Sequence, residues 1–389
     1  MPEDNKQNKE IFEIVKKAAL ITIFRVPNYG SVLQAFASVR LLGKLGYACD
    51  IIDYIYPNEW HYSLGKRRYR ESLVKKVILL IAVRLGLKKS ARQRYELKKF
   101  FTQHLPLTKS FNSLESLEKN DWTGYDVTVV GSDQVWNPNY HYGDKAFMLS
   151  FIPDNIKKTS IASSFATDSV PEQYQHRFKE CLSRFSSITV RENNGKRIIL
   201  DKLNLNIDTD VVLDPTLMVS SEEWLDALDI KKNAPGRKYL LIYYLSYAFK
   251  TAPYIFELAE YLSKKYDMEI RVICGDMIAK KHLKGFINET GCSPQRFVSL
   301  FANAEMVVTS SFHGTAFAVN FGKPLAAIVP QGGDDRQKSL LKNLGIENCA
   351  VYKDTPMDSV NPFYNIEKEQ AKLDELRSSS IEIIKNNLA

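Results

Sequence analysis

Polar side chains gather at the start of one predicted helix in the second half of the chain. Met306–Thr309 is a β-branched run typical of a buried strand, and Ala316–Phe321 is an apolar run typical of a buried helix. The residues between them that can act on a ligand are Ser310, Ser311, His313, Gly314 and Thr315. Because a helix N-terminus has unpaired N–H groups and a positive dipole, it attracts anions. A histidine there can donate to an anion or transfer a proton, although it can also simply cap the helix.

A carboxylate and a tryptophan follow another predicted strand, Asp126–Val130. Open α/β sheets bind ligands beyond the carboxyl ends of their strands, which is where Asp133 is expected to lie. Asp133 could position or deprotonate a hydroxyl group, or it could only shape the turn. Trp136 offers a flat apolar face to a ligand, unless it belongs to the core.

Two arginines are candidates for binding an anion. Arg191 follows the predicted strand Ser187–Val190, and Arg336 precedes a short predicted helix. A planar guanidinium grips a carboxylate or a phosphate through two parallel hydrogen bonds. The alternative for Arg191 is an ion pair with Glu192 or Asp214, and for Arg336 an ion pair with the two acids before it.

The first turn of the chain supplies a further set of polar residues. It follows the predicted strand Ala18–Phe24 and precedes the predicted helix Val32–Leu45, which Ser31 could cap. Asn28, Tyr29 and Ser31 could line a cleft there, or they could only form a sound turn. The turn lacks the pattern GxGxxG, so it does not predict a dinucleotide site.

These candidates must be positioned by two sets of alternating strands and helices. Such alternation is typical of parallel sheets with helices on both faces, and 389 residues are too many for one compact core. We therefore expect an α/β protein with two Rossmann-like domains facing a cleft, which is a GT-B-like architecture. The expected divisions are an N-terminal domain over 1–230, a C-terminal domain over 239–360, and a terminal helix within 361–389 that crosses back to the first domain. The stretch between the two domains, KKNAPGRK, has the composition of a linker.

Cysteine content and the first residues indicate the cellular compartment. The five cysteines are widely scattered and form no CxxC pair, so we expect neither a zinc site nor a disulfide framework, and no other metal is expected. The polar start MPEDNKQNKE is not a signal peptide. A cytoplasmic location is therefore expected.

Positive charge is concentrated in one segment, the basic helical insertion at about 65–100. Gly65–Phe100 holds thirteen Lys or Arg and two acids, a net charge of +11, so the rest of the chain carries −3. This distribution favours a local surface contact over nucleic-acid binding. The run VILLIAV inside it is too short to span a bilayer, which needs about 20 apolar residues. The segment is either a solvated insertion or an interfacial contact with an anionic membrane surface.

Several of these motifs together resemble the polysaccharide pyruvyl transferase family. The closest resemblance is in SSFHGTAFAVNFGKPL, starting at Ser310, and GSDQVWNP, starting at Gly131. The segments SVLQAFASVRLL, ITVREN and VVLDPTLMVSSEEW extend it from about Ala18 to Gly345. One departure is that many members have Arg two residues before the histidine, where this chain has Ser311.

The resemblance implies a reaction and its partners. Phosphoenolpyruvate would give its enolpyruvyl unit to two hydroxyls of a sugar, forming a cyclic ketal and phosphate, with no further cofactor. The acceptor would be a sugar or a lipid-linked oligosaccharide used in capsule or exopolysaccharide biosynthesis. Since such units are often assembled on lipid carriers, the resemblance also suggests a peripheral place at the inner face of the cell membrane.

The same resemblance assigns roles to the candidates. His313 would be the general acid that protonates the donor's methylene carbon, and Asp133 the base for the acceptor hydroxyl. The donor-binding residues would be Arg191, Ser310, Ser311, Gly314, Thr315 and Arg336. The acceptor-binding residues would be Asn28, Tyr29, Ser31 and Trp136. Two alternatives stay open: a GT-B glycosyltransferase that uses a sugar nucleotide, and, because of Ser311, a catalytically inactive binding homologue.

Overall fold

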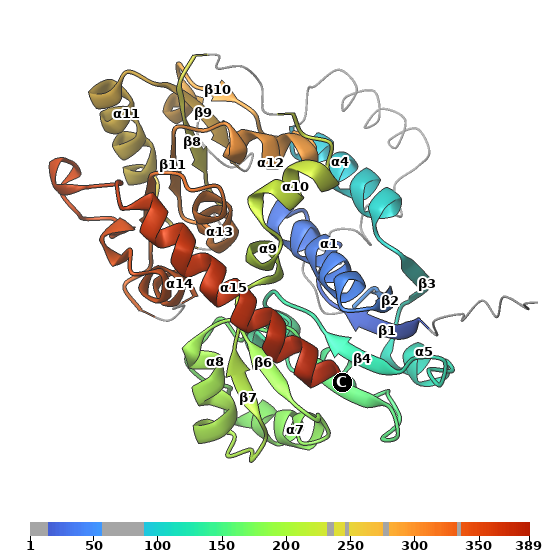
Figure 1. Cartoon of the computed structure of the whole chain (residues 1–389). Coiled ribbons are helices and arrows are strands. Elements are labelled where there is room, and N and C mark those ends of the chain that lie inside the picture. Colours follow the sequence, from blue (N-terminus) through green and yellow to red (C-terminus); the bar gives the residue numbers. More distant parts are fainter. Residues whose placement is uncertain (1–14, 57–88, 232–236, 246–248, 275–279, 333–335) are drawn as a thin grey trace, which may run out of the picture.

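The computed structural model describes residues 15–56, 89–231, 237–245, 249–274, 280–332 and 336–389 (Figure 1). Two parallel sheets organise them, with the strand orders β3-β2-β1-β4-β5 and β10-β9-β8-β11-β12-β13. The first sheet consists of β1 (Lys16–Ile21), β2 (Tyr47–Tyr54), β3 (Leu107–Phe111), β4 (Val127–Val130) and β5 (Lys157–Ser160). The second consists of β8 (Tyr239–Tyr243), β9 (Glu269–Ile273), β10 (Ile287–Asn288), β11 (Met306–Thr309), β12 (Leu325–Ile328) and β13 (Ala350–Val351). A separate ladder pairs β6 (Ile188–Val190) with β7 (Thr209–Val211).

Helices connect these strands and cover the sheets. The helices along the first half are α1 (Tyr29–Lys44), α4 (Lys89–His104), α5 (Leu114–Glu118), α6 (Pro138–His141), α7 (Glu172–Leu182), α8 (Asn193–Arg197), α9 (Pro215–Met218) and α10 (Ser221–Ala227). Those of the second half are α11 (Tyr254–Tyr266), α12 (Pro294–Ala302), α13 (Phe312–Asn320), α14 (Arg336–Leu344) and α15 (Ile366–Leu388). Short helical turns lie at Lys145–Met148, Ile198–Lys202, Lys280–Leu283, Glu347–Cys349 and Met357–Ser359.

The order of the strands determines where a ligand site can form. In the first sheet the chain builds outward from β1 to β2 and β3, then returns to place β4 on the other side of β1. In the second sheet it builds from β8 to β9 and β10, then returns with β11 on the other side of β8. Such a reversal leaves a crevice at the carboxyl ends of the two central strands. Each sheet therefore offers one crevice, beyond β1 and β4 and beyond β8 and β11.

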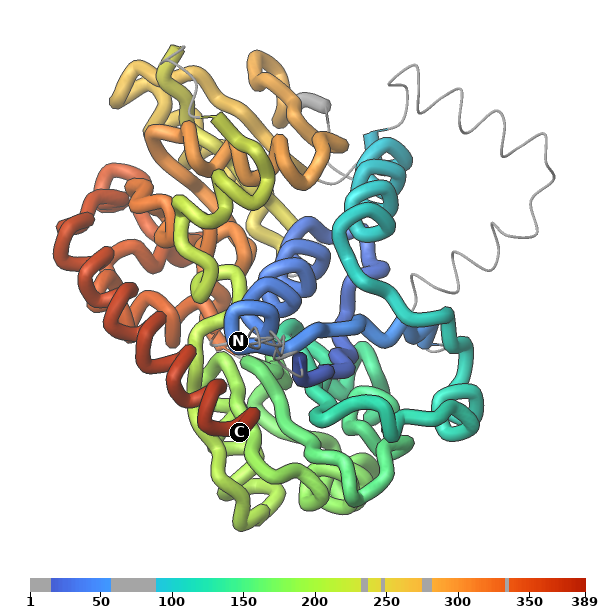
Figure 2. The backbone as a smooth tube through the Cα atoms, turned by 45° about the vertical axis from the view of Figure 1, so that its right-hand side comes forward, coloured from blue at the N-terminus to red at the C-terminus, as the bar shows by residue number. Residues whose placement is uncertain are grey.

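The two sheets are joined by buried helices. One continuous apolar core contains residues of α1 and α9 together with residues of α12 and α13, including Val32, Leu217, Phe297 and Phe317. The ring of Tyr29 stacks on Phe297 with centroids 4.5 Å apart. Figure 2 shows α4 beside α1 and close to α12 at this junction. The start of α1 is therefore held directly against the second half of the chain.

The terminal helix α15 contacts both halves. It packs on α13, α14 and α9 (Figure 1). Farther along it, the Ser380 hydroxyl accepts from the Leu213 N–H at 3.0 Å, and the Leu388 carbonyl accepts from the Tyr47 hydroxyl at 2.8 Å. Arg377 donates to the carbonyl of Leu217 and to the side chain of Asn320.

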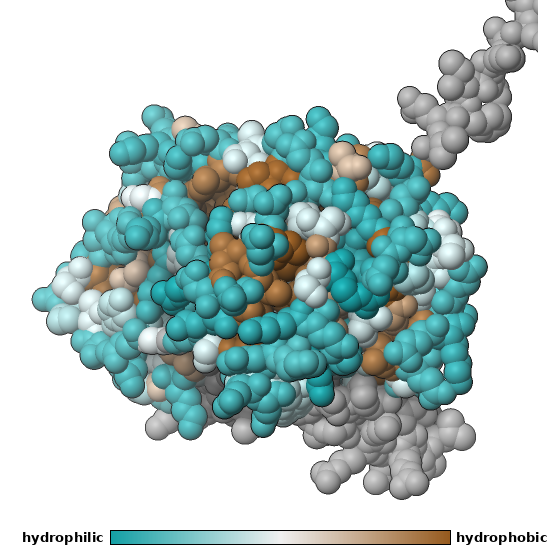
Figure 3. Space-filling model, turned by 90° about the horizontal axis from the view of Figure 1, so that it is seen from below, coloured by the Kyte–Doolittle hydropathy of each residue, from teal (hydrophilic) through white to brown (hydrophobic). Residues whose placement is uncertain are grey.

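One face of the molecule shows how the side chains are distributed. Figure 3 shows mostly hydrophilic side chains, with an apolar patch near the centre of that face. Most large apolar side chains belong to the interior instead, since whole strands such as β4, β8, β11 and β12 are buried. Within the described part of the chain, no helix has the length and apolar character needed to cross a membrane.

The expected α/β, GT-B-like architecture is confirmed, but the predicted start of the first helix is wrong. That helix begins at Tyr29 rather than Val32, and its N-cap is Asn28, whose side chain accepts from the Gly30 N–H at 2.9 Å. Ser31 lies inside the helix and cannot cap it. The VILLIAV run, most of the basic insertion and most of the predicted linker lie outside the described residues.

Candidate active site

A pocket of about 350 Å³ lies where the two crevices meet. The first sheet contributes Asn28 after β1 and Asp133 after β4. The second sheet contributes Leu245 after β8, and Ser310 with Ser311 after β11. All four central strands therefore direct loop residues into one pocket. The pocket is also lined by His313 and Arg336, and by the residues at its rim, Gln134, Asn137, Asn139, Tyr140 and Phe249.

His313 is held at the start of α13. Ser311 caps this helix by accepting from the Gly314 N–H at 3.4 Å, and the Thr309 hydroxyl accepts from the Ser311 N–H at 3.1 Å. The His313 side chain is buried, and its Nε2 lies 3.8 Å from Asp214 without a hydrogen bond. The Ser310 hydroxyl is also buried without a partner. Since buried polar atoms normally have a partner, these two atoms mark a place for a ligand.

The protonation state of His313 follows from its surroundings. Burial lowers the pKa of His313 below its ordinary value, and the carboxylates of Asp214 and Asp133 oppose this shift without reversing it. Arg191 and Arg336 lower it further. The imidazole is therefore neutral at neutral pH when the pocket holds no anion.

Gly30 determines where the imidazole lies. A Cβ built on Gly30 would stand 2.1 Å from His313 Nδ1 and 2.3 Å from its Cγ, which is far inside contact distance. The ring of His313, from the second half of the chain, therefore packs on bare backbone at the start of α1. Nothing local to Gly30 in the sequence indicates this requirement.

Replacing Gly30 by alanine is expected to lower kcat by about 10- to 100-fold, because the ring must move away from its working position. The fold should persist, since alanine favours a helix more than glycine does. Gly43→Ala is the matched control, because a Cβ on Gly43, in the same helix, would meet nothing within 4 Å. Turnover and thermal melting of both variants check this. Equal kcat values for the two variants would contradict the role of Gly30.

Asp133 is held in an unusual conformation by several donors. Its φ is +74°, a region that residues other than glycine rarely adopt and that often marks functional sites. Its carboxylate accepts from the Ser31 hydroxyl at 2.5 Å and from the Gln134 N–H at 2.8 Å. Burial would raise the pKa of Asp133, but Arg191, His313 and Ser31 lower it below its ordinary value. Asp133 is therefore an ionised hydrogen-bond acceptor and a weak base.

Arg191 is buried between two aspartates. Its guanidinium donates to Asp214 at 2.8 Å and to Asp133 at 3.4 Å, and it stacks on Phe312 with 4.4 Å to the ring centroid. It has no exposed side-chain surface and does not line the pocket. The expected role in donor binding stays a prediction, and the two aspartates already occupy the fork of this arginine. Arg191 positions them.

Asp214 is a site residue that the sequence suggested only as a partner of Arg191. It accepts from the Ser132 hydroxyl at 2.6 Å and from the N–H and hydroxyl of Thr216. Burial would raise its pKa, but His313 and Arg191 hold it below the ordinary value. Its carboxylate therefore stands ready to stabilise a protonated His313. In the sequence, its place directly before Pro215 and shortly after the β-branched residues Val211 and Val212 could have indicated a strand end.

Three of the residues expected to bind the acceptor are buried and make contacts within the protein. Trp136 is in the core and donates to the Phe147 carbonyl at 2.8 Å. Tyr29 is buried and donates to the Cys292 carbonyl. Ser31 is buried against Asp133. None of these three side chains is among the described residues that line the pocket.

Two of the residues expected to bind the donor also make contacts within the protein. Gly314 provides close packing, since a Cβ there would lie 2.2 Å from the Thr309 hydroxyl. Thr315 is fully buried, donating to the Ser311 carbonyl and accepting from Gln337. Neither residue lines the pocket. Arg336, by contrast, does line it from the start of α14, with its guanidinium 5.8 Å from the ring of Phe312.

The rim of the pocket contains residues that the sequence did not single out. Asn139 and Tyr140 lie on the short helix α6, and Tyr140 is 40% exposed. Gln134 precedes them and accepts from the Asn137 amide through its side-chain oxygen. Together they offer an accessible aromatic ring and amide groups beside Asp133. Among the residues that the structure describes, no group of three His, Cys, Asp or Glu side chains is arranged to hold a metal ion.

Comparison with known proteins gives one family match and a set of structural similarities. The family model described as polysaccharide pyruvyl transferase matches residues 28–332. The solved UDP-GlcNAc 2-epimerase from Neisseria meningitidis, bound to UDP-GlcNAc, is similar with a TM-score of 0.50 and 12% identity over 96% of this chain and 99% of that one. The MnaA–UDP structure from S. aureus has a TM-score of 0.51 and 11% identity over 94% and 96%. At these identities the similarity concerns the fold alone. No curated protein is significantly similar in sequence.

Proposed function

The chain belongs to the polysaccharide pyruvyl transferase family, and from this premise we propose that it transfers the enolpyruvyl unit of phosphoenolpyruvate to two hydroxyls of one sugar. The products are a cyclic pyruvate ketal and phosphate. The observation that carries the proposal is the pocket between the sheets, where His313 and Ser310 keep buried polar atoms unpaired. The acceptor is a sugar of a polysaccharide or of its lipid-linked precursor.

The donor side of the pocket suits a compact polyanion. The N-terminus of α13 points its dipole at the pocket, and Ser310 and His313 supply polar groups. Arg336 supplies the cation. This arginine compensates for Ser311, which stands where many family members have Arg and which caps α13 in this chain. The donor phosphate and carboxylate thus have partners without Arg191.

The chemistry requires one proton to be added and two to be removed. Protonated His313 gives its proton to the methylene carbon, which leaves a cation-like centre at the adjacent carbon. One sugar hydroxyl adds to that carbon, and its new carbon–oxygen bond takes the place of the lost π bond. The second hydroxyl then replaces the phosphate, whose carbon–oxygen bond breaks as the other new bond forms. One hydroxyl proton returns to His313 and the other leaves with phosphate. Asp133 orients the first attacking hydroxyl and passes its proton to the departing phosphate.

Proton uptake should accompany donor binding. His313 is neutral in the free protein because burial lowers its pKa, and a bound phosphate and carboxylate raise that pKa again. Phosphoenolpyruvate should therefore bind with uptake of up to one proton near neutral pH, and its affinity should fall as pH rises. Calorimetry in buffers of different ionisation enthalpy measures this uptake. His313→Gln, which cannot titrate, corrects for the donor's own phosphate, and identical uptake in this variant would contradict the assignment.

The acceptor side lies at the rim. Gln134, Asn139 and Tyr140 bring amide and hydroxyl groups to the mouth of the pocket beside Asp133. Sugars present both hydroxyls and an apolar ring face, so a half-exposed tyrosine beside amides suits them. Tyr140 takes the role that the sequence suggested for Trp136.

Tyr140→Ala is expected to raise the acceptor KM by about threefold to tenfold, because it removes the ring face. Tyr140→Phe should keep most of the affinity. Tyr142→Ala is the control, since Tyr142 is 47% exposed in the same segment but does not line the pocket. Steady-state kinetics with varied acceptor measure the effect. An equal rise of the acceptor KM in the Tyr142 variant would contradict the proposal that the ring of Tyr140 contacts the acceptor sugar.

Ligand binding separates this proposal from a sugar-nucleotide glycosyltransferase. Calorimetric titration with phosphoenolpyruvate should give one site whose affinity falls in Arg336→Ala. UDP-GlcNAc should not compete for it. Tight binding of UDP-GlcNAc, with no binding of phosphoenolpyruvate, would overturn the proposal.

We further propose weak, reversible attachment to the cytoplasmic face of the membrane, where a lipid-linked acceptor is met. The support is the net charge of +11 in Gly65–Phe100. Co-sedimentation with anionic vesicles, lost at high salt, tests it. Failure to bind anionic vesicles at low salt would reject the attachment.

A further inference from the structure

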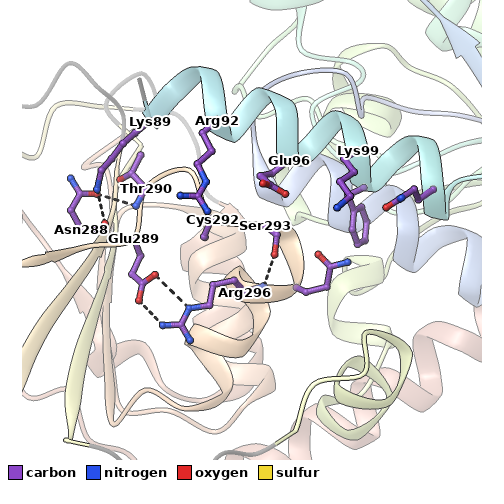
Figure 4. Close-up of a pocket in the computed structure, with 13 residues that line it drawn as sticks. Lys89, Arg92, Glu96, Lys99, Asn288, Glu289, Thr290, Cys292, Ser293 and Arg296 are labelled. Carbon is purple, nitrogen blue, oxygen red and sulfur yellow. Dashed lines mark hydrogen bonds and ion pairs between the residues drawn. The ribbon is translucent and has the colours of Figure 1, made fainter. Parts of the chain in front are cut away.

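A second cavity, of about 630 Å³, lies on another side of the loop that leads into α1 (Figure 4). One wall is helix α4, and the other is the segment Asn288–Arg296, which runs from β10 into α12. None of its lining residues lines the pocket around His313. The cavity is therefore separate from the candidate active site.

The α4 wall presents a single face of the helix. Lys89, Arg92, Glu96, Lys99 and Gln103 follow one another at intervals of three or four residues, so they project on the same side. Figure 4 shows the side chain of Arg92 reaching from α4 toward Cys292 on the opposite wall. The helix thus brings cationic groups into the space between the two halves of the chain.

Two of these cations have no partner within the described residues. Neither Arg92 nor Lys99 makes an ion pair or a hydrogen bond there, whereas Lys89 donates to the Asn288 carbonyl at 2.6 Å. On the opposite wall Glu289 is already occupied, since Arg296 donates to it at 2.5 Å and Arg271 at 3.2 Å. Of the described carboxylates that line the cavity, Glu96 alone has no arginine partner. The cavity has an excess of positive charge that an anion would neutralise.

Both walls also contact the loop that shapes the active site. Gln93 of α4 donates to the Pro27 carbonyl at 3.1 Å, and Tyr29 donates to the Cys292 carbonyl at 2.8 Å. Gly291 allows the walls to approach closely, since its φ is +88° and a Cβ there would lie 2.7 Å from the Lys89 carbonyl oxygen. The cavity is therefore built by packing on both sides.

We infer that this cavity binds a diphosphate or two neighbouring phosphate groups. Arg92 and Lys99 are seven residues apart, which is about 10 Å along a helix, so one small anion cannot readily contact both. An extended dianionic group can, and guanidinium and ammonium groups are the usual partners of phosphate oxygens. The source is either the diphosphate of a carrier-linked molecule or the headgroups of anionic lipids. The inference does not depend on the proposed reaction.

Titration with inorganic pyrophosphate tests whether the cavity beside α4 binds a diphosphate. Saturating phosphoenolpyruvate is present, so that this donor occupies the pocket at His313. One pyrophosphate should bind, and Arg92→Ala with Lys99→Ala should weaken it at least about tenfold. The control is Lys98→Ala with Lys368→Ala, which removes two exposed cations outside the cavity. Glu96→Gln should strengthen binding, since it removes the carboxylate that repels the ligand. Equal affinity in the Arg92–Lys99 variant and its control would overturn the inference.

Vesicles distinguish the two sources. Phosphatidylglycerol vesicles, with phosphatidylcholine vesicles as the neutral reference, should bind less to the Arg92–Lys99 variant if lipid headgroups enter the cavity, and pyrophosphate should then compete. If that variant loses pyrophosphate binding but binds vesicles normally, the source is a carrier-linked diphosphate. If the variant loses neither, no phosphate-bearing ligand uses this cavity. Phosphoenolpyruvate affinity should be unchanged throughout, which keeps this test separate from the proposed function.

Discussion

Replacing His313 by alanine should reduce turnover by about 100- to 10,000-fold, the usual cost of losing a general acid. The reason lies in its surroundings, because Asp214 stands 3.8 Å from Nε2 and the ring rests on Gly30. Among the residues that the structure describes, no other imidazole lines the pocket. The fold should persist, because the Ser311 cap of α13 and the apolar remainder of that helix do not involve the imidazole.

Phosphate release from phosphoenolpyruvate, measured with acceptor present, gives the rate. His176→Ala is the control, since His176 lies on α7, outside the pocket. His313→Gln keeps a polar side chain of similar length but cannot carry the proton, so it should be as slow as the alanine variant. A folded His313→Ala protein with normal turnover would remove the acid role.

Replacing Arg191 by alanine should destabilise the protein by about 3–5 kcal/mol, because it leaves the buried carboxylates of Asp133 and Asp214 without their shared cation. The melting temperature should fall by roughly 4–6 °C, because a chain of 389 residues has an unfolding entropy of about 0.8 kcal/mol per kelvin. The loss is structural first, because the guanidinium has no exposed surface and does not reach the pocket. Arg191→Lys should recover part of the stability, since lysine keeps the charge but cannot bridge both aspartates with a planar fork.

Thermal melting of the two variants measures this. Lys145→Ala is a suitable control, because Lys145 pairs with a half-exposed Glu180 and such surface pairs contribute only about 0–1 kcal/mol. If Arg191→Ala melted like the control but bound phosphoenolpyruvate much more weakly, the arginine would be a donor ligand after all. If the Arg191→Ala protein does not accumulate, the melting temperature and phosphoenolpyruvate affinity of Arg191→Lys are compared with those of the control instead.

The sequence predicted the fold class and the two loops that matter most, because strand ends and helix starts are local features. The β-branched run before Ser310 and the apolar run after Thr315 locate His313 at a helix start without any tertiary information. Asp133 was located in the same way, beyond a buried strand. Parallel topology then brings such loops to one edge of each sheet.

The direction in which each loop side chain points could not be predicted in this way. Trp136 and Tyr140 are both aromatic and only four residues apart, yet one is in the core and the other at the rim. Arg191 looked like an anion ligand because its two aspartate partners come from separate loops. The need for Gly30 depends on a ring contributed from the far half of the chain.

The most direct test of the account is a turnover assay with phosphoenolpyruvate and a panel of lipid-linked oligosaccharides, analysed by mass spectrometry and phosphate release. We predict that one acceptor gains a cyclic pyruvate ketal, with one phosphate released for each ketal formed. In deuterium oxide, the new methyl group should carry one deuterium, because the proton from His313 exchanges with solvent. Transfer of a sugar from UDP-GlcNAc to the same acceptors, with phosphoenolpyruvate left unused, would contradict it.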